Sequence, residues 1–192
     1  MSGPWIAAVL ALWAVVVLLA VLVLGLLRRI APVLEQAERA ARAGLAMDAD
    51  LGAPDGTTVP SFAVVDAAGR SVPFEDVGPA DRVVLFVDAD CPACGAVTAG
   101  LAADPATATL PLVVVTGRST PPSRYDALAA IGVPVVGQPD GAATTAFAQR
   151  AFPLAFAVAG GTVVASAVPG SVADLERLAG LLSHRDASRS RP

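Results

Sequence analysis

The two cysteines of this chain, Cys91 and Cys94, are the side chains best suited to chemistry, and they lie three positions apart in a Cys-Pro-Ala-Cys segment. Side chains at positions i and i+3 of a helix are about 5–6 Å apart, and the Cα atoms of a disulfide are usually about 4.4–6.8 Å apart. The pair can therefore change between dithiol and disulfide with little backbone movement. We expect Cys91 near the N-terminus of a helix, where backbone N–H groups and the helix dipole favour the nucleophilic thiolate.

The cysteine pair has other interpretations. A structural disulfide of this spacing would close a very short loop and would stabilise the fold little. A zinc site within the chain would need further ligands, and the single histidine, His184, lies far away near the C-terminus. Two inert buried thiols are also consistent with the sequence. The pattern favours redox exchange over all three.

The segments around the cysteines predict a strand-to-helix junction. A continuous apolar run over 83–87 precedes the pair and a helix over 95–103 follows it. A second apolar run covers 112–115, and such runs are typical of strands covered on both faces of a parallel or mixed α/β sheet. The other expected elements are a hairpin over 61–65 and 71–74, helices over 124–131 and 142–150, a short strand over 133–136, a Gly-Gly hairpin over 154–168 and a last helix from Ser171.

The N-terminal segment predicts a membrane anchor. Residues 6–27 carry no charge, and at 1.5 Å per residue they would span about 33 Å, enough for a bilayer core of about 30 Å. Trp5 stands where an interfacial aromatic residue is expected. No small-residue cleavage site precedes Arg28 and Arg29, so an uncleaved single-pass anchor is favoured over a signal peptide.

Two principles disagree about the orientation of this anchor. Arginine lies only on the C-terminal side of the span, and the positive-inside rule would then place the domain in the cytoplasm. A tethered cysteine pair instead suits a compartment in which disulfides persist, outside the cytoplasm. We expect a single-pass protein of the cell membrane with an extracytoplasmic domain, against the charge rule.

Changes in composition predict the domain organisation. The expected parts are an anchor over 1–29, a juxtamembrane helix and linker over 30–55, a domain over 56–184 and a disordered polar tail over 185–192. The juxtamembrane helix is interpreted as a solvated spacer, with a dimerising or lipid-lying helix as the alternative. The net charge of −4 argues against a nucleic-acid partner, which demands a basic face.

Three landmarks together resemble the thioredoxin fold over about residues 56–184. They are the Cys-Pro-Ala-Cys segment after an apolar strand, Phe152-Pro153, and the 154–168 hairpin followed by Pro169-Gly170. The resemblance implies an α/β domain with a mixed central sheet flanked by helices. The N-terminal hairpin and the additional segment over about 121–150 resemble the membrane-tethered TlpA-like branch. The anchor and the Cys-Pro-x-Cys motif resemble its MauD type, associated with methylamine utilisation.

The resemblance implies a role for each residue of the site. Cys91 would be the exposed attacking thiolate and Cys94 the buried resolving thiol, with a cis peptide bond at Phe152-Pro153 beside them. Phe152 would give the substrate an apolar platform or would be a core residue. No cofactor is implied beyond the redox-active disulfide. The implied partners are thiol- or disulfide-bearing client proteins and a redox partner in or outside the membrane.

The sequence departs from the thioredoxin pattern at two positions. Asp90 stands where thioredoxins usually have Trp, and Leu85 stands where they have a buried Asp. Asp88 and Asp90 would disfavour the Cys91 thiolate by like-charge repulsion, which Arg150 would offset. Both acids could equally be exposed loop residues or a helix N-cap, and Arg150 could be a solvated side chain.

Three functions follow from these observations. The first is a membrane-anchored thiol–disulfide oxidoreductase acting on extracytoplasmic clients, including a disulfide-rich dehydrogenase if the MauD resemblance holds. The second is a peroxidase of the same fold, for which Thr98 and Arg150 are poor candidates. The third is a non-catalytic tethered module that carries a metal such as copper or a thiol-bearing cargo such as an apocytochrome.

Overall fold

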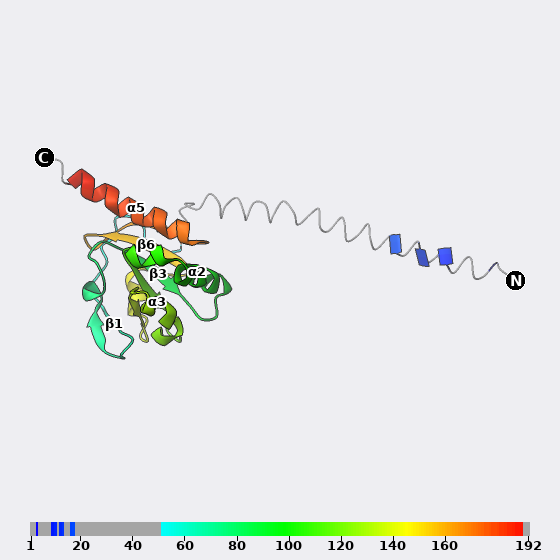
Figure 1. Cartoon of the computed structure of the whole chain (residues 1–192), viewed down its shortest axis with the longest axis horizontal. Coiled ribbons are helices and arrows are strands. Elements are labelled where there is room, and N and C mark those ends of the chain that lie inside the picture. The colour runs from blue at the N-terminus through cyan, green and yellow to red at the C-terminus, as the bar shows by residue number, and fades with distance from the viewer. Residues whose placement is uncertain (1–2, 4–8, 11, 14–15, 18–50, 190–192) are drawn as a thin grey trace. The chain divides into compact units, whose positions relative to one another are not determined.

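The computed structural model describes residues 3, 9–10, 12–13, 16–17 and 51–189 (Figure 1). The chain divides into two units, Met1–Ala43 and Gly44–Pro192, and each is described by itself. In the first unit, the described residues are helical and exposed. Among all described residues, no helix is both long enough and apolar enough to cross a membrane. The expected anchor over 6–27 and juxtamembrane segment over 30–55 lie largely outside the described residues.

The second unit is built on a five-stranded mixed sheet with strand order β5-β4-β3-β6-β7. The strands are β3 (Arg82–Val87), β4 (Leu112–Thr116), β5 (Val135–Val136), β6 (Leu154–Ala159) and β7 (Thr162–Ala167). β3 pairs parallel with β4 and antiparallel with β6, so it lies at the centre. Every residue of β3, β4 and β6 is buried. Burial on both faces explains why their sequences are continuously apolar, and it confirms the predicted mixed α/β sheet.

Helices and a small hairpin cover the two faces of this sheet. The helices are α2 (Pro92–Ala103), α3 (Asp126–Ala130), α4 (Ala142–Ala146) and α5 (Val172–Arg189), with 3-10 turns at Phe74–Asp76, Pro105–Thr109 and Pro122–Tyr125. α2, α3 and α5 enclose a core of leucine, valine and alanine that includes Cys94. On the other face, the N-terminal hairpin and α4 enclose a second core. Five of the six phenylalanines pack there ring against ring.

The predicted N-terminal hairpin is present as a separate two-stranded sheet of β1 (Ala63–Val65) and β2 (Ser71–Pro73). The stretch over residues 51–65, here named the N-terminal strap, leads into it. Thr58 of the strap forms a bridge to Thr162 at the outer strand β7. Val65 forms a second bridge to Gly137, just after the other outer strand, β5. The strap therefore reaches both edges of the central sheet.

Two expected helix ends are wrong. The helix expected over 142–150 ends at Ala146. Phe147 is fully buried in the aromatic core, and Ala148 adopts a positive φ of 46°, so the chain turns away before Arg150. At the C-terminus, α5 continues to Arg189 instead of giving way to a disordered tail at Arg185. No glycine or proline interrupts that segment, so nothing in the sequence ends the helix there.

Candidate active site

The cysteine pair lies where β3 passes into α2, as predicted. Cys91 is the N-cap residue of α2, and Pro92 occupies the first helical position, where a missing N–H is tolerated. Cys91 and Cys94 form a disulfide with Cα atoms 5.3 Å apart. The Cys94 N–H donates to Cys91 Sγ over 3.1 Å. The sulfur of Cys91 therefore takes the place that a serine or aspartate oxygen occupies in most helix caps.

The two sulfurs differ in their access to solvent. Cys94 has no exposed surface and belongs to the aliphatic core beneath α2. Cys91 is half-buried and packs against the edge of that core. A partner molecule can therefore approach the disulfide only at Cys91.

The carboxylate of Asp88 organises the turn that leads to Cys91. Asp88 Oδ1 accepts the N–H of Asp90 over 3.0 Å, and Asp88 Oδ2 lies 3.5 Å from Thr120 Oγ1. A Cβ atom at Gly117, just after β4, would overlap this carboxylate, so glycine is required for their close approach. Asp90 is exposed. The N-cap interpretation of these acids is wrong, because the cap is Cys91.

The core near Cys94 contains no acid that could replace the buried Asp of thioredoxins. Leu85 is fully buried and belongs to the same cluster as Cys94. Within residues 51–183, Asp174 is the single buried acid, and it lies at the start of α5. Asp88 is half-buried and faces the turn.

The Phe152-Pro153 segment lies beside the cysteine turn, and its peptide bond is cis. Because Phe86 pairs with Leu154 across β3 and β6, Pro153 is level with Val87 at the end of β3. Pro153 is buried, whereas Phe152 is 36% exposed. The interpretation of Phe152 as a core residue is therefore wrong, and it is the phenylalanine that lies outside the aromatic core.

Two cavities flank the turn and share Asp88. One, of about 260 Å³, lies along α2 and is lined by Gly95, Thr98 and Tyr125 among others. Burial raises the pKa of the Tyr125 hydroxyl, and the negative charge of Asp88 raises it further. The other cavity, of about 330 Å³, lies beside Phe152 and is polar. Its other lining residues are Arg118, Ser119, Thr144, Gln149 and Arg150.

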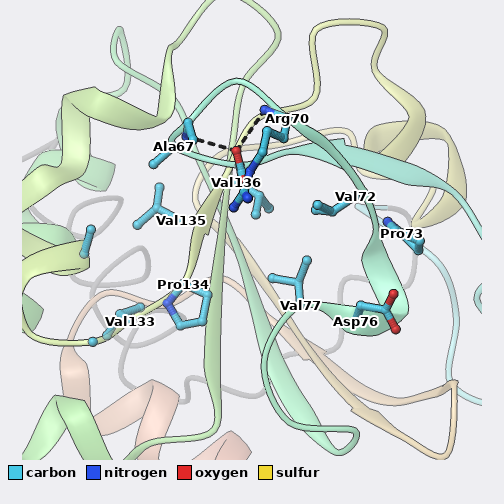
Figure 2. Close-up of a pocket in the computed structure, with 14 residues that line it drawn as sticks. Ala67, Arg70, Val72, Pro73, Asp76, Val77, Val133, Pro134, Val135 and Val136 are labelled. Carbon is cyan, nitrogen blue, oxygen red and sulfur yellow. Dashed lines mark hydrogen bonds and ion pairs between the residues drawn. The ribbon is translucent and has the colours of Figure 1, made fainter.

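A third cavity, of about 540 Å³, lies away from the cysteines between the hairpin and β5 (Figure 2). Its walls are mainly apolar. Val72 of β2 and Val77 after the 3-10 turn form one wall, and Val133 and Val135 at β5 form the other. None of the predicted site residues lines it. Among the described residues, no group of three or more His, Cys, Asp or Glu side chains is arranged to hold a metal ion.

Several residues of the site were missed from the sequence. Gly117, Arg118 and Thr120 follow β4. Gly117 and Thr120 contact Asp88, and Arg118 lines a cavity with it, only because β3 and β4 are parallel neighbours. The carboxyl ends of parallel strands meet at one edge of a sheet, and ligands commonly bind at that edge. That rule, applied to the two apolar runs, could have drawn attention to the Thr-Gly-Arg segment.

Comparison with solved structures places this architecture among known proteins. The thioredoxin domain of a thiol-disulfide oxidoreductase from Bacteroides vulgatus aligns with a TM-score of 0.53 and 21% identity, over 67% of this chain and 98% of that one. A thiol:disulfide interchange protein from Bacteroides sp. gives a TM-score of 0.52 and 20% identity, over 68% and 91%. A thio-disulfide isomerase from Thermus thermophilus gives 0.50 and 23%, over 67% and 96%. No protein-family model and no curated protein matches the chain.

The chain has a thioredoxin-like fold. This confirms the fold implied by the three sequence landmarks. At these identities the likeness shows the fold alone.

Proposed function

We propose that this chain is a thiol–disulfide oxidoreductase in which Cys91 exchanges with the client and Cys94 resolves the mixed disulfide. The observation that carries the proposal is the asymmetry of the pair. Cys91 is accessible and its sulfur accepts the Cys94 N–H at the helix N-terminus, while Cys94 is fully buried. A helix N-terminus and a donated N–H both stabilise a thiolate at Cys91 after reduction.

The exchange proceeds through two displacements at sulfur. The Cys91 thiolate attacks one sulfur of a client disulfide, forms a mixed disulfide and releases the other client sulfur as a thiolate. Cys94 then loses its proton and attacks Cys91 Sγ, which forms the internal disulfide and releases the second client thiolate. Two electrons pass to the client, and a dithiol reductant must return them. Oxidation of a client dithiol is the reverse sequence, with a disulfide or quinone as the final oxidant.

The neighbouring residues have positioning roles in this proposal. The Asp88 carboxylate holds the turn by accepting the main-chain N–H of Asp90. Pro153 lies level with the end of β3, and exposed Phe152 offers an apolar surface to a bound client. The peroxidase alternative receives no support from Thr98, whose hydroxyl donates to the Cys94 carbonyl over 2.8 Å inside α2.

We propose further that the enzyme is anchored in the cell membrane through residues 6–27 and works outside the cytoplasm on thiol- or disulfide-bearing proteins. The uncharged apolar segment and the durability of disulfides in that compartment support this placement. The TlpA-like and MauD-like resemblance adds a disulfide-rich dehydrogenase as a client. A membrane-impermeant thiol reagent should label Cys91 in intact cells after mild reduction, and labelling only after lysis would refute the placement.

Substitution of each cysteine tests the activity itself. The reduced chain should reduce the disulfides of insulin, and Cys91→Ser should lower that rate about 100-fold or more, because the nucleophile is lost. Cys94→Ser should accumulate a mixed disulfide with the client, visible as a band on a non-reducing gel that dithiothreitol removes. The doubly substituted chain is the control and should form no such band. Undiminished turnover in Cys91→Ser, or no mixed disulfide in Cys94→Ser, would refute the proposal.

A further inference from the structure

Three arginines stand at the two cavities that flank the cysteine turn. Arg118 and Arg150 line the cavity beside Phe152, and Arg124 lines the cavity along α2. We infer that these arginines bind carboxylate side chains of the client, so the preferred substrates are polypeptides with Asp or Glu next to the exchanging cysteine. This inference rests on the proposed function and specifies its substrate class.

The other arginines with described side chains are engaged elsewhere. Arg70 and Arg177 each form an ion pair with a nearby aspartate, and Arg82 is buried and donates to main-chain carbonyls. Within residues 51–183, the three cavity arginines form no ion pair and donate no side-chain hydrogen bond. Acidic residues outnumber basic ones in the chain, 17 to 13. Within residues 51–183, the arginines with neither an ion pair nor a side-chain hydrogen bond therefore all lie at the two cavities beside the cysteine turn, where a client would bind.

The cavity beside Phe152 has one further side chain that can donate to an anion. Ser119 lines its wall and carries a hydroxyl group, whereas the Thr144 hydroxyl already donates to Gln149 Oε1 over 3.3 Å. The Gln149 side chain is held in place, because it donates to the Ala151 carbonyl and accepts from Thr144 Oγ1. Arg118 lies against Gly141, where a Cβ atom would overlap its guanidinium. Arg118 therefore has a defined position over the backbone at the start of α4.

A buried amide beside Arg118 also lacks an acceptor. Gln138 is 1% exposed, and its Oε1 accepts the N–H of Thr144 over 2.7 Å. Its Nε2 has no hydrogen-bond partner among the described residues. Gln138 lines a cavity of about 270 Å³ that shares Arg118 and Ser119 with the cavity beside Phe152. The Nε2 atom has almost no exposed surface, so it does not itself contact a ligand, but its unpaired N–H groups add positive potential beside Arg118.

Of the two cavities, the one beside Phe152 has the charges that favour a bound carboxylate more strongly. Two arginines and one acid, Asp88, line that cavity, whereas Arg124 and Asp88 oppose each other in the cavity along α2. One Asp88 oxygen is already used by the Asp90 N–H. The planar guanidinium matches a carboxylate in geometry as well as in charge. A client segment that places its cysteine on Cys91 would run past Phe152, so its flanking side chains would reach these arginines.

Two matched peptides test the inference. Each carries one intramolecular disulfide, with glutamate on both sides of the first cysteine in one peptide and glutamine in the other. Single-turnover reduction by the reduced chain should be about five- to tenfold faster for the glutamate peptide. Raising the salt concentration from about 0.05 M to about 0.5 M should reduce this preference. The Arg118→Gln/Arg150→Gln variant should lose most of it, while Arg70→Gln, which alters an exposed arginine on the hairpin, should keep it.

A small neutral disulfide, bis(2-hydroxyethyl) disulfide, separates failure of the inference from failure of the proposed function. The wild type and Arg70→Gln should reduce it at rates within about twofold, since Arg70 pairs with Asp66 on the hairpin. For Arg118→Gln/Arg150→Gln, the rate with this disulfide measures any general change in Cys91 reactivity, and each peptide rate is divided by it. Equal rates for the two peptides with normal turnover of the neutral disulfide would overturn the inference alone. A preference lost equally in Arg70→Gln would also overturn it, because net charge would then be the cause. No reduction of any of the three probes would overturn the proposed function as well.

Discussion

The two faces of the central sheet are packed with different side chains, and the contrast is visible within one strand. β6 alternates between large residues on the hairpin side and alanines on the helix side, where Ala155, Ala157 and Ala159 belong to the core that contains Cys94. The small side chains let α5 pack closely on β6 and β3. The opposite face holds the phenylalanine cluster and contains no cysteine. The helix face therefore builds the reactive pair, and the aromatic face supports the loop that ends at Pro153.

The contrast between the two faces can be tested by substitution, and the largest loss of stability is expected from Phe147→Ala. Phe147 is fully buried, and its ring contacts those of Phe62, Phe74, Phe86 and Phe156. Its removal should lower the free energy of unfolding by about 4 kcal/mol, from lost burial and the cavity left behind. Urea denaturation followed by circular dichroism measures this. Phe152→Ala is the matched control and should cost less than about 1 kcal/mol, because that ring is exposed; similar losses in both variants would contradict the contrast.

A somewhat smaller effect is expected from Leu178→Ala on the helix face. Leu178 is fully buried in the cluster that includes Cys94, and its truncation should cost about 3 kcal/mol. It should also speed alkylation of Cys94 in the reduced chain, since the core around that sulfur loosens. Mass spectrometry of each alkylated cysteine measures the rate. Leu181→Ala, at a position 41% exposed on the same helix, should leave both quantities nearly unchanged, and faster Cys94 alkylation in Phe147→Ala than in Leu178→Ala would argue against separate faces.

The smallest effect is expected from Asp174→Asn at the start of α5. Burial acts to raise the pKa of Asp174, but hydrogen bonds from Gly170, Ser171 and Arg177 outweigh burial and lower it below its ordinary value of 3.8. The carboxylate therefore contributes stability that is fully present above the unfolded-state pKa and is lost as the pH falls through the folded-state pKa. At pH 7 the substitution should cost about 1 kcal/mol, and this difference should shrink as the pH falls below 3.8 and through the lower folded-state pKa.

Urea titrations at several pH values measure the difference between wild type and Asp174→Asn. Glu176→Gln is the control for the loss of one acidic charge, because Glu176 is exposed on the same turn. A cost for Asp174→Asn that persists unchanged in acid would show that the charge of Asp174 does not stabilise the helix start.

The sequence was most informative where local pattern and tertiary structure agree. Continuous apolar runs identified β3 and β4, because the middle of a strand buried on both faces has no polar position to interrupt it. The Gly-Gly turn identified the β6–β7 hairpin, whose outer strand β7 is only partly buried. The strand-to-helix position of the cysteines was also predictable. The end of α4 was not, because it depends on Phe147 reaching a core assembled from distant segments.

The candidate site was predictable only in part for the same reason. Cys91 and Cys94 stand out by type and spacing, and Phe152-Pro153 by its place before a hairpin. The contact between Asp88 and Thr120 joins residues 32 positions apart, and no local pattern announces it. Asp88 was singled out for its charge, whereas its visible role is to hold a turn. Arg118 appeared as an ordinary loop residue until the fold brought it beside Phe152.

The N-terminal strap has a consequence for solubility. An outer strand with unpaired N–H and C=O groups is a template on which another extended chain can add, and this is a common route to aggregation. Gly56 and Thr57 of the strap form hydrogen bonds with Val163 of β7. Val65 exchanges two hydrogen bonds with Gly137 beside β5. The strap thus forms main-chain hydrogen bonds at both edges of the central sheet, next to β5 and β7. The strap therefore leaves fewer unpaired main-chain groups at which another extended chain could add.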